Sequence, residues 1–559
     1  MLFFEIIFKI FLLIILIHFN KKNYPKFYLL KGKPYKMKDI QDLTLQEKIG
    51  QLLFIGFKEP NLTEEVRNMI REYKIGNFVL FLRNIKNKEQ LEQLTRDIHE
   101  EVINSTGIMP FIAIDQEGGN NIRIMDKSTY YPGPMTIAST NIDNAKIIGH
   151  MMGNHLLSLG INMNFAPSLD VNNNPKNQII CIRSYSDKPE IVSKYGLELI
   201  KGMQEEGIIA TAKHFPGHGD TEIDTHLDLP VLNFTKERLY NIELKPFKDA
   251  IDNGIKSIMA AHIIFREVDK ENPATISKDI LKGILRDEFN FKGLIISDCM
   301  EMKAISDKIT TPIGVAKGLK AGLDFALVCH TKKRQIDSIL KIKEEIDNNV
   351  LTVEEIDEKI KRILKYKKEV YDVMKKKFFN NEKNMEVFKD EKISLILQNI
   401  VDSSLTFVHG KKLEIKGKTL VYWCQLSATN IAEDIISSNS INNMLNKEIP
   451  SIDTIEYKAK KYNKEIIDKS KEYDTVIFLS FNAFKFESQV KMINEINQIC
   501  SNFFVISMRN PYDYLKIDEN INYYTLYEST PNAQRTIVKF LKGEIDANGH
   551  LPIDLNHNI

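Results

Sequence analysis

From Met37 onward, short apolar runs alternate with longer amphipathic stretches, and this alternation limits the folds open to the chain. Short buried runs bounded by polar residues are typical of strands, and most intervals between them are long enough for a helix and its loops. Eight strands with helical crossovers predict an α/β fold of the (β/α)8 barrel type, with an open doubly wound sheet as the competing architecture. The predicted strands are Leu52–Phe57, Asn77–Leu82, Pro110–Asp115, Ile161–Phe165, Ile208–His214, Ser257–His262, Gly293–Asp298 and Phe325–Cys329.

A charged segment from Lys375 to Lys392 predicts a boundary between two domains. The length of 559 residues allows two or more. Beyond the boundary, a smaller α/β domain is expected from strand patterns at Thr419–Trp423, Thr475–Ser480, Phe503–Met508 and Tyr523–Leu526, none of which is followed by a nucleotide-binding fingerprint. We therefore divide the chain into an N-terminal segment and linker (1–36), a barrel (37–375), a linker (376–400) and a C-terminal domain (401–559).

The first nineteen residues are almost wholly apolar. Residues 10–17 would serve as the apolar centre of a signal peptide, although no small-x-small cleavage site follows them. A membrane anchor in residues 2–19 and a mis-assigned start before Met37 are the alternatives. We expect an extracytoplasmic protein, secreted or membrane-anchored, or a cytoplasmic one if Met37 is the true start.

Charge and cysteine content exclude some partners and sites. The formal net charge of +1 gives no electrostatic reason to expect nucleic acid. The five cysteines are scattered without CxxC spacing, which argues against a disulfide framework or a thiolate zinc site. We expect no cofactor, and the oligomeric state stays open.

Residues 213–226 combine histidines, aspartates and glycines in one short run. This run contains three histidines, two aspartates and two glycines, and it follows the apolar run that begins at Ile208. A strand that ends in a glycine-rich loop crowded with such groups is typical of an active site. Asp224 and His226 project to the same side in extended backbone, so the carboxylate can orient the imidazole as an acid/base.

Two further polar clusters follow predicted strands. Asp-Gln-Glu-Gly-Gly (115–119) follows the third, and Ser-Asp-Cys-Met-Glu (297–301) lies at the end of the seventh. In a barrel the carboxyl ends of the strands converge on one face, where the catalytic groups of such folds lie. The three clusters are therefore predicted to form one site.

The loop resembles a signature of family-3 glycoside hydrolases, in particular their β-N-acetylglucosaminidase branch. The match is Lys-His-Phe-Pro-Gly-His-Gly-Asp-Thr, two variable positions, Asp-Thr-His, and then Leu229-Pro230. Other segments that are similar to the family, over roughly residue 40 to the C-terminus, are 76–84, 114–119, 164–171, 183–186, 259–262, 273–277, 296–302, 321–324, 508–513 and 543–552.

The resemblance implies a barrel followed by an αβα sandwich and a retaining, double-displacement mechanism. Asp298 falls where the family has its nucleophile, which forms a glycosyl-enzyme intermediate. His226 matches the acid/base, and Asp224 matches its carboxylate partner. The implied substrate is a glycan with a terminal β-linked N-acetylglucosamine, with peptidoglycan fragments as the expected source.

The resemblance also implies the sugar contacts. Asp115 matches the carboxylate that binds sugar hydroxyls, Lys213 and His214 match the pair that grips the aminosugar, and Arg123 and Arg183 match its arginines.

One departure lies beside these residues. The family continues Glu-Gly-Gly with Arg-Val-x-Arg, whereas this chain has Asn120 and Asn121 before Ile122 and Arg123. Arg123 is kept and the first arginine is missing, so the loop is expected to pack differently. We interpret Glu117 as a brace for the glycine turn and leave it out of the predicted site.

Each of these residues also has a purely structural interpretation. Asp224 and His226 could form an ion pair that braces the loop, and Asp298 could be the N-cap of a following helix. A zinc site at His218, Asp220 and Asp224 would be a further possibility, but compact ligand spacing such as HExxH is missing, and no metal is predicted. Residue 213 could be an exposed lysine, residue 214 a core histidine, and the two arginines could form surface salt bridges.

Four functions follow from these residues and the resemblance. The first is an exo-acting β-N-acetylglucosaminidase, a hydrolase. The second is a phosphorylase that transfers the sugar to phosphate, because a histidine repels a phosphate dianion less than a second carboxylate would. A β-glucosidase of the same family is an alternative within the enzymes, and a non-catalytic glycan-binding protein is the alternative outside them.

Overall fold

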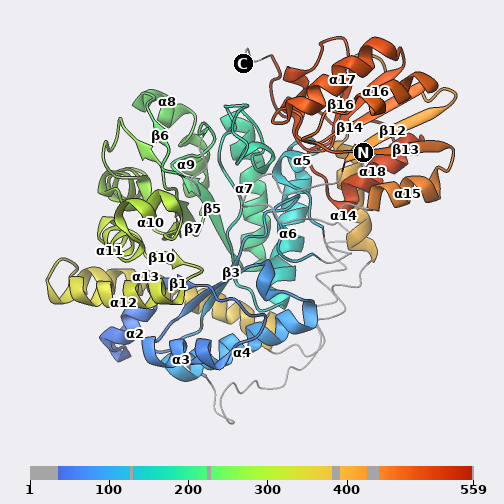
Figure 1. Ribbon diagram of the computed structural model, residues 1–559. Helices are drawn as coiled ribbons and strands as arrows, with labels where there is room; N and C mark the ends of the chain where they lie inside the picture. The colour runs from blue at the N-terminus through green and yellow to red at the C-terminus, as the bar shows by residue number, and fades with distance from the viewer. Residues whose placement is uncertain (1–34, 126–129, 223–227, 380–390, 425–439, 557–559) are drawn as a thin grey trace.

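The structure is a computed structural model that describes residues 35–125, 130–222, 228–379, 391–424 and 440–556 (Figure 1). The predicted signal or anchor lies outside the described residues. Within the described part of the chain, no helix is long and apolar enough to cross a membrane.

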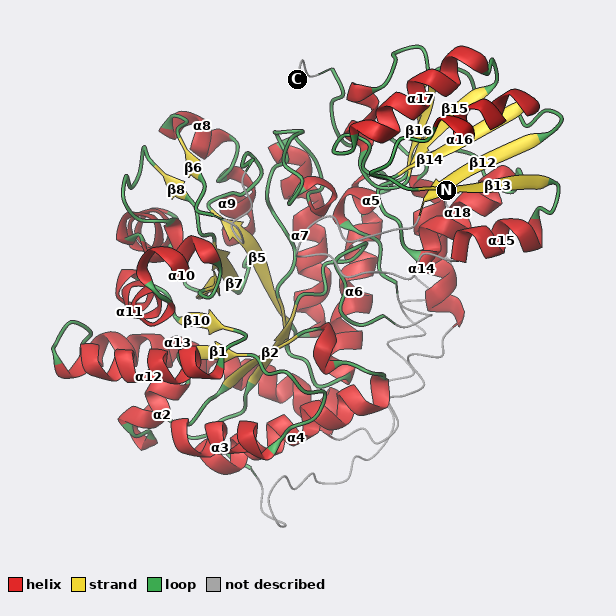
Figure 2. Cartoon of the chain, in the orientation of Figure 1, coloured by secondary structure: helices red, strands yellow, loops and turns green. Residues whose placement is uncertain are grey.

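Eight parallel strands close into a barrel with helices around it, which confirms the predicted fold class and excludes the open sheet (Figure 2). The strands neighbour one another in the order β1-β10-β9-β7-β5-β4-β3-β2. Their bounds are β1 Leu53–Ile55, β2 Asn77–Leu80, β3 Phe111–Ile114, β4 Met163–Asn164, β5 Ile209–Phe215, β7 Ser257–Ala260, β9 Leu294–Cys299 and β10 Phe325–Val328. Each lies within or overlaps one of the eight predicted strands, and a short pair, β6 Val231–Leu232 and β8 Ile264–Phe265, lies outside the barrel.

The barrel helices begin at residues that suit helix N-termini. Thr44 and Glu47 form the capping box expected from Thr-Leu-Gln-Glu, and Thr63 and Asn87 cap the next two helices. The helices are α2 Leu45–Gly50, α3 Glu64–Tyr73, α4 Lys88–Thr106, α5 Pro134–Ala138, α6 Asp143–Ser158, α7 Pro189–Glu206, α8 Lys236–Asn241, α9 Lys245–Asp252, α10 Lys303–Ile309, α11 Thr311–Ala321, α12 Lys332–Asp347 and α13 Val353–Met374, with a π-helical segment at Asp279–Glu288.

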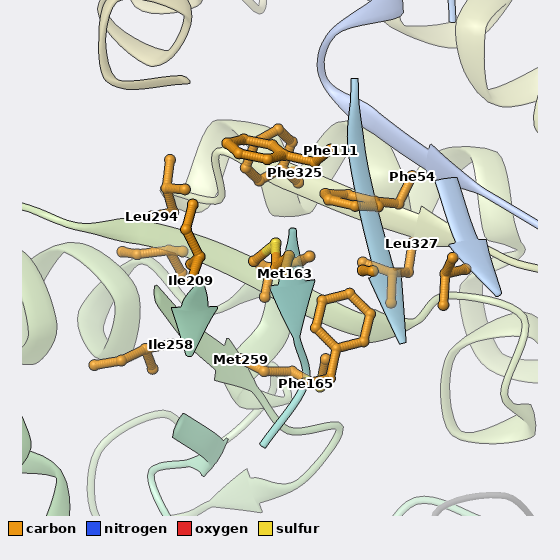
Figure 3. Close-up of a cluster of buried hydrophobic side chains, with 14 of the residues drawn as sticks. Phe54, Phe111, Met163, Phe165, Ile209, Ile258, Met259, Leu294, Phe325 and Leu327 are labelled. Atoms are coloured by element: carbon orange, nitrogen blue, oxygen red, sulfur yellow. The ribbon is translucent and has the colours of Figure 1, made fainter. Parts of the chain in front are cut away.

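Aromatic side chains fill the inside of the barrel (Figure 3). The ring centroid of Phe54 lies 5.1 Å from that of Phe325, 5.9 Å from that of Phe165 and 6.4 Å from that of Phe111. These rings are buried, so the barrel interior is a packed core rather than a channel.

The second domain is an αβα sandwich, as predicted. Its sheet has the order β11-β16-β15-β14-β12-β13, in which only the β11–β16 pair is antiparallel. Helices α14, α15 and α18 pack on one face of the sheet, and α16 and α17 pack on the other. The elements are β11 Thr406–His409, β12 Thr419–Cys424, β13 Ile452–Tyr457, β14 Thr475–Ser480, β15 Phe503–Ser507, β16 Asn522–Thr525, α14 Glu391–Ser404, α15 Ser440–Glu448, α16 Lys464–Lys469, α17 Glu487–Ile499 and α18 Pro531–Leu541.

The structure differs from the sequence-based expectation at two places in this domain. Strands β11 and β13 are not among the predicted strands. They lie at the two edges of the sheet and expose part of their side chains, so their apolar pattern is weak. Residues 391–400, which we expected in the linker, begin helix α14, because Leu397, Ile400 and Val401 recur at helical spacing and are buried.

Candidate active site

A cavity of about 560 Å³ opens at the carboxyl ends of the barrel strands. Phe165, Met259 and Leu327 line its inner end, at the top of the packed core (Figure 3). The structure brings together around this cavity every predicted site residue that it describes: Asp115, Arg123, Arg183, Lys213, His214 and Asp298. They come from segments up to 183 residues apart in sequence (298 − 115).

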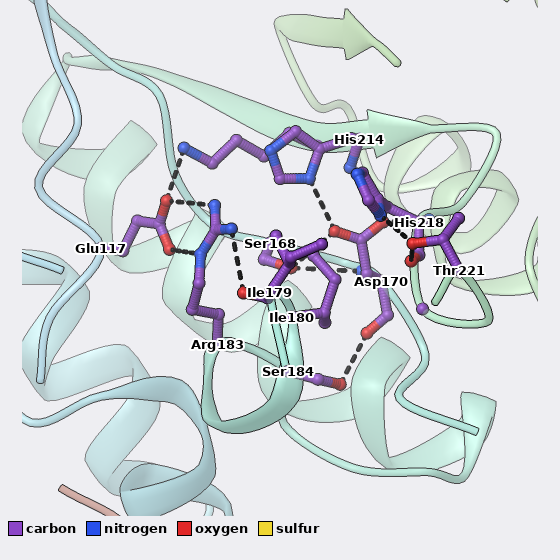
Figure 4. A network of polar contacts seen from close by, with 12 residues as sticks. Glu117, Ser168, Asp170, Ile179, Ile180, Arg183, Ser184, His214, His218 and Thr221 are labelled. Carbon is purple, nitrogen blue, oxygen red and sulfur yellow. Dashed lines mark hydrogen bonds and ion pairs between the residues drawn. The ribbon is translucent and has the colours of Figure 1, made fainter. Parts of the chain in front are cut away.

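The centre of the polar network is Glu117, which the sequence-based prediction of the site omits (Figure 4). Its two carboxylate oxygens accept hydrogen bonds from Arg183 Nε at 2.9 Å and Nη2 at 2.8 Å. Lys213 Nζ lies 2.6 Å from Glu117 Oε1 and 2.8 Å from Asp115 Oδ1. Lys213 is therefore buried rather than exposed, and the ion pair that Arg183 forms is buried rather than on the surface.

Electrostatics keep this network ionised inside the protein. Burial opposes the charge on Glu117, but Arg183 and Lys213 outweigh it and hold the pKa of the carboxyl well below its usual range. Burial likewise disfavours the charge on Lys213, yet Asp115 and Glu117 raise the pKa of the ammonium group. The cations therefore keep their charge and their positions, so they can donate hydrogen bonds to acceptor groups of a ligand in the cavity.

A second buried carboxylate, Asp170, holds His214. Asp170 Oδ2 lies 2.7 Å from His214 Nδ1, and Asp170 Oδ1 accepts the backbone N–H groups of His214 at 3.1 Å and His218 at 2.7 Å. Burial raises the pKa of Asp170, but His214 outweighs this and lowers it to about 2. This contact fixes His214 Nδ1 toward Asp170, so Nε2 is the ring nitrogen left for a ligand.

His218 also lines the cavity, but its surroundings are not those of a metal ligand. Its Nδ1 lies 2.8 Å from Thr221 Oγ1, and burial lowers the pKa of its ring to about 4, so that it is neutral at pH 7. Among the described residues, no group of three or more His, Cys, Asp or Glu side chains is placed to hold a metal ion.

Asp298 lies at the carboxyl end of β9, in the wall of the cavity. Its Oδ1 accepts the backbone N–H of Cys299 at 2.7 Å. Helix α10 begins only at Lys303, with Met302 at its N-cap position, so the structure does not support the alternative that Asp298 is a helix N-cap. A half-buried carboxylate at a strand end is placed to meet a ligand in the cavity.

Arg123 also lines the cavity, and the loop before it is a tight turn. Asn121 O accepts the N–H groups of Glu117 at 3.0 Å and Gly118 at 3.2 Å. Gly118 and Gly119 have φ values of 103° and 57°, which other residues rarely adopt. The two glycines therefore allow the turn that aims Glu117 into the network.

Comparison with known proteins agrees with this geometry. The model of the glycosyl hydrolase family 3 N-terminal domain matches residues 44–366, which is more than half of the chain. The chain belongs to glycoside hydrolase family 3. The cavity lies where barrel enzymes have their active sites.

Several relatives in family 3 resemble this chain. Beta-hexosaminidase A of Pseudoalteromonas piscicida is 34% identical over 320 residues, which are 51% of this chain and 54% of that relative, so the chain matches about half of its length. A beta-hexosaminidase of Hydrogenovibrio crunogenus is 31% identical over 51% of this chain and 82% of its own. A solved β-N-acetylglucosaminidase from Paenibacillus sp. str. FPU-7 is 30% identical with a TM-score of 0.86, covering 92% of this chain and 100% of that one.

Two residues that the family resemblance assigns to catalysis, Asp224 and His226, lie outside the described residues. Their roles as acid/base and partner, and that of Asp298 as nucleophile, stay predictions.

The structure of this family-3 enzyme also brings Cys299 and Cys329 to the cavity wall, beside His330. Cys299 ends strand β9, and Cys329 directly follows the neighbouring strand β10. Contact with the thiol of Cys329, followed by contact with His330, lowers the pKa of Cys299, whereas the same thiol contact raises the pKa of Cys329. Sequence spacing alone missed this pair, although Cys329 ends one predicted strand and Cys299 directly follows another.

Proposed function

We propose that this glycoside hydrolase is a retaining exo-β-N-acetylglucosaminidase. The observation that carries the proposal is the buried network of Lys213, Glu117, Arg183 and Asp115 in one wall of a cavity that also holds Asp298. The relatives named beta-hexosaminidase and β-N-acetylglucosaminidase support the same substrate class.

In this proposal Asp298 attacks the anomeric carbon and forms a covalent glycosyl-aspartate while the glycosidic oxygen leaves. His226 protonates that oxygen and then takes a proton from the water that hydrolyses the intermediate. Asp224 holds the histidine ring and favours its charged form. The chemistry balances with water as the only second substrate.

We assign the sugar contacts to Asp115, Arg123, Arg183, Lys213 and His214. Asp115 and the cation of Lys213 lie 2.8 Å apart, so one sugar hydroxyl can meet an acceptor and a donor together. His214, held by Asp170, offers a single orientation of its Nε2. Peptidoglycan fragments are the proposed source of the terminal N-acetylglucosamine. The extracytoplasmic location of the protein, which is inferred from residues 1–36, stays a prediction.

The competing activities differ in their products, which decides the test. Wild-type protein is incubated with an aryl β-N-acetylglucosaminide and with the matching β-glucoside, each with and without inorganic phosphate. Release of N-acetylglucosamine from the first substrate alone supports the proposal. Formation of N-acetylglucosamine 1-phosphate would identify a phosphorylase, and cleavage of the glucoside alone would identify a β-glucosidase.

The role of Asp298 is tested with Asp298→Ala and a matched control, Asp307→Ala, at an exposed position on helix α10. We expect a fall in kcat of about a thousandfold or more for Asp298→Ala, because the covalent step is lost. The control is expected to match the wild type. Equal rates for Asp298→Ala and the wild type would remove Asp298 from the mechanism, and binding of N-acetylglucosamine without turnover by the wild type would indicate a glycan-binding protein.

A further inference from the structure

The second domain contacts the loop that carries Glu117 and the segment just before helix α5. The side chain of Asn120 pairs reciprocally with Ser529: Asn120 Nδ2 donates to Ser529 Oγ at 3.1 Å, and Ser529 N donates to Asn120 Oδ1 at 3.1 Å. Both residues are buried. We call this pair of hydrogen bonds the Asn120–Ser529 clasp.

Neighbouring contacts hold the same segments together. Glu528 Oε2 accepts hydrogen bonds from Gly133 N at 2.8 Å and from Thr136 Oγ1 at 2.7 Å, and Asn532 Nδ2 donates to Tyr130 O at 3.1 Å. Gly119 packs so closely on this region that an added Cβ would lie 2.9 Å from Gly133 Cα. The turn therefore lies between the sugar pocket and the second domain with no room to shift.

The turn transmits this constraint to the pocket over a short distance. Asn120 is three residues from Glu117, and the hydrogen bonds from Glu117 N and Gly118 N to Asn121 O close the turn between them. Glu117 in turn fixes Arg183 and Lys213. A displacement of Asn120 would thus move the carboxylate that positions both cations.

The second domain supports Arg183 through another contact. Tyr512 OH accepts a hydrogen bond from Asn172 Nδ2 at 3.2 Å, and Asn172 Oδ1 accepts the backbone N–H of Cys181 at 3.1 Å. Tyr512 also packs with Cys181 and Ile182 in one buried apolar cluster, next to Arg183 in sequence. Two loops of the pocket are therefore held by the same domain.

We infer that the C-terminal domain is a positioning part of the sugar site, and that Asn120 and Ser529 are positioning residues that set Glu117, and through it Arg183 and Lys213, in place. Asn120 stands where the family resemblance places an arginine, so the clasp is this chain's own way of holding the turn. The inference rests on the proposed function only in taking the cavity as the sugar-binding site. Neither residue lines the cavity.

The test compares Asn120→Ala, Ser529→Ala and the double variant with Ser139→Ala. Ser139 is a buried hydroxyl of the same interface that contacts Ser404 O at 3.5 Å but lies outside the turn. Steady-state kinetics on the aryl glycoside that the wild type cleaves, and thermal unfolding, are measured for all four. If the wild type cleaves none, the proposed function fails, and the Kd for N-acetylglucosamine replaces KM in the comparison.

We expect each clasp variant to raise KM by about tenfold with a smaller change in kcat, because misplaced binding groups weaken the sugar complex. The double variant is expected to be no worse than the single ones, because both remove the same contact. Ser139→Ala is expected to keep the KM of the wild type at a similar thermal midpoint. An unchanged KM in the clasp variants, an equal rise in Ser139→Ala, or multiplying effects in the double variant would overturn the inference.

Discussion

Single side chains in this molecule owe their properties to what surrounds them rather than to their type. Lys213 and Glu117 are both buried, yet they stay charged because each has an opposite charge within 3 Å: 2.6 Å separates them. His99 is also buried, and among the described residues no carboxylate compensates it; its Nε2 lies 2.9 Å from Gly160 O, and burial lowers its pKa to about 4. The charged pair of Lys213 and Glu117 suits the binding of a ligand, whereas the buried His99 affects the stability of the fold.

His99 predicts a pH dependence of stability. Its pKa is about 4 in the folded protein and 6.5 in the unfolded chain, so only the unfolded chain takes up a proton between these values. Stability is therefore complete above pH 6.5 and falls as the pH drops toward 4, by up to about 1.4 kcal/mol per pH unit for this group. In His99→Gln, denaturant unfolding from pH 7 to 4.5 should show a smaller fall, whereas the exposed His409→Gln should behave as the wild type. An unchanged slope in His99→Gln would contradict this.

Cys299 predicts a selective reaction with thiol reagents. Its lowered pKa gives it more thiolate at neutral pH than the other four cysteines, which are buried. Iodoacetamide at pH 7 is expected to label Cys299 first and to abolish activity, because the adduct would occupy the part of the cavity beside Asp298. Peptide mass spectrometry locates the label, N-acetylglucosamine should slow the reaction, and Cys299→Ser should resist inactivation. Inactivation of Cys299→Ser at the wild-type rate would contradict the prediction.

Elements differ in how far the sequence predicts them. The eight barrel strands were predictable because they are buried in a parallel sheet and most of them contain a short apolar run. The edge strands β11 and β13 were not, because most of their side chains are exposed or only partly buried. Among the predicted site residues, those that the structure describes lie around the cavity, and Asp224 and His226 lie outside the described residues. Glu117 was left out of the predicted site and Asp170 was missed, because pairing across segments such as Asp170 with His214 leaves no spacing signal.

The capping box at the start of α2 predicts a modest loss of stability when it is broken. Thr44 Oγ1 accepts the N–H of Glu47 at 3.2 Å, and Glu47 Oε2 accepts the N–H of Thr44 at 2.8 Å. Thr44→Ala is expected to lower the free energy of unfolding by about 1 kcal/mol, because a helix N–H loses its partner. Thr44→Ser keeps the hydroxyl and should lie close to the wild type in the same denaturant titration. Equal stability of all three proteins would show that the cap contributes nothing here.

At the scale of the whole molecule, the two domains are joined by buried polar contacts as well as apolar ones. Glu528, Ser529 and Tyr512 of the second domain each bond to barrel loops. No sequence pattern predicted these pairs, because the two partners of each pair lie 340 to 409 residues apart. Contacts at such separation depend on the finished packing of both domains, which composition and periodicity do not encode.

The aromatic core beneath the cavity also determines how a ligand enters and leaves the site. Because Phe54, Phe111 and Phe325 close the barrel axis, a sugar that enters the cavity has to leave by the way it came. In the proposed exo-acting reaction, a long glycan cannot slide through the barrel and be cut at successive links, so its end has to withdraw and re-enter for each cleavage. The monosaccharide released in this reaction would occupy the same closed end of the cavity as the next chain terminus, so we expect the product to inhibit competitively.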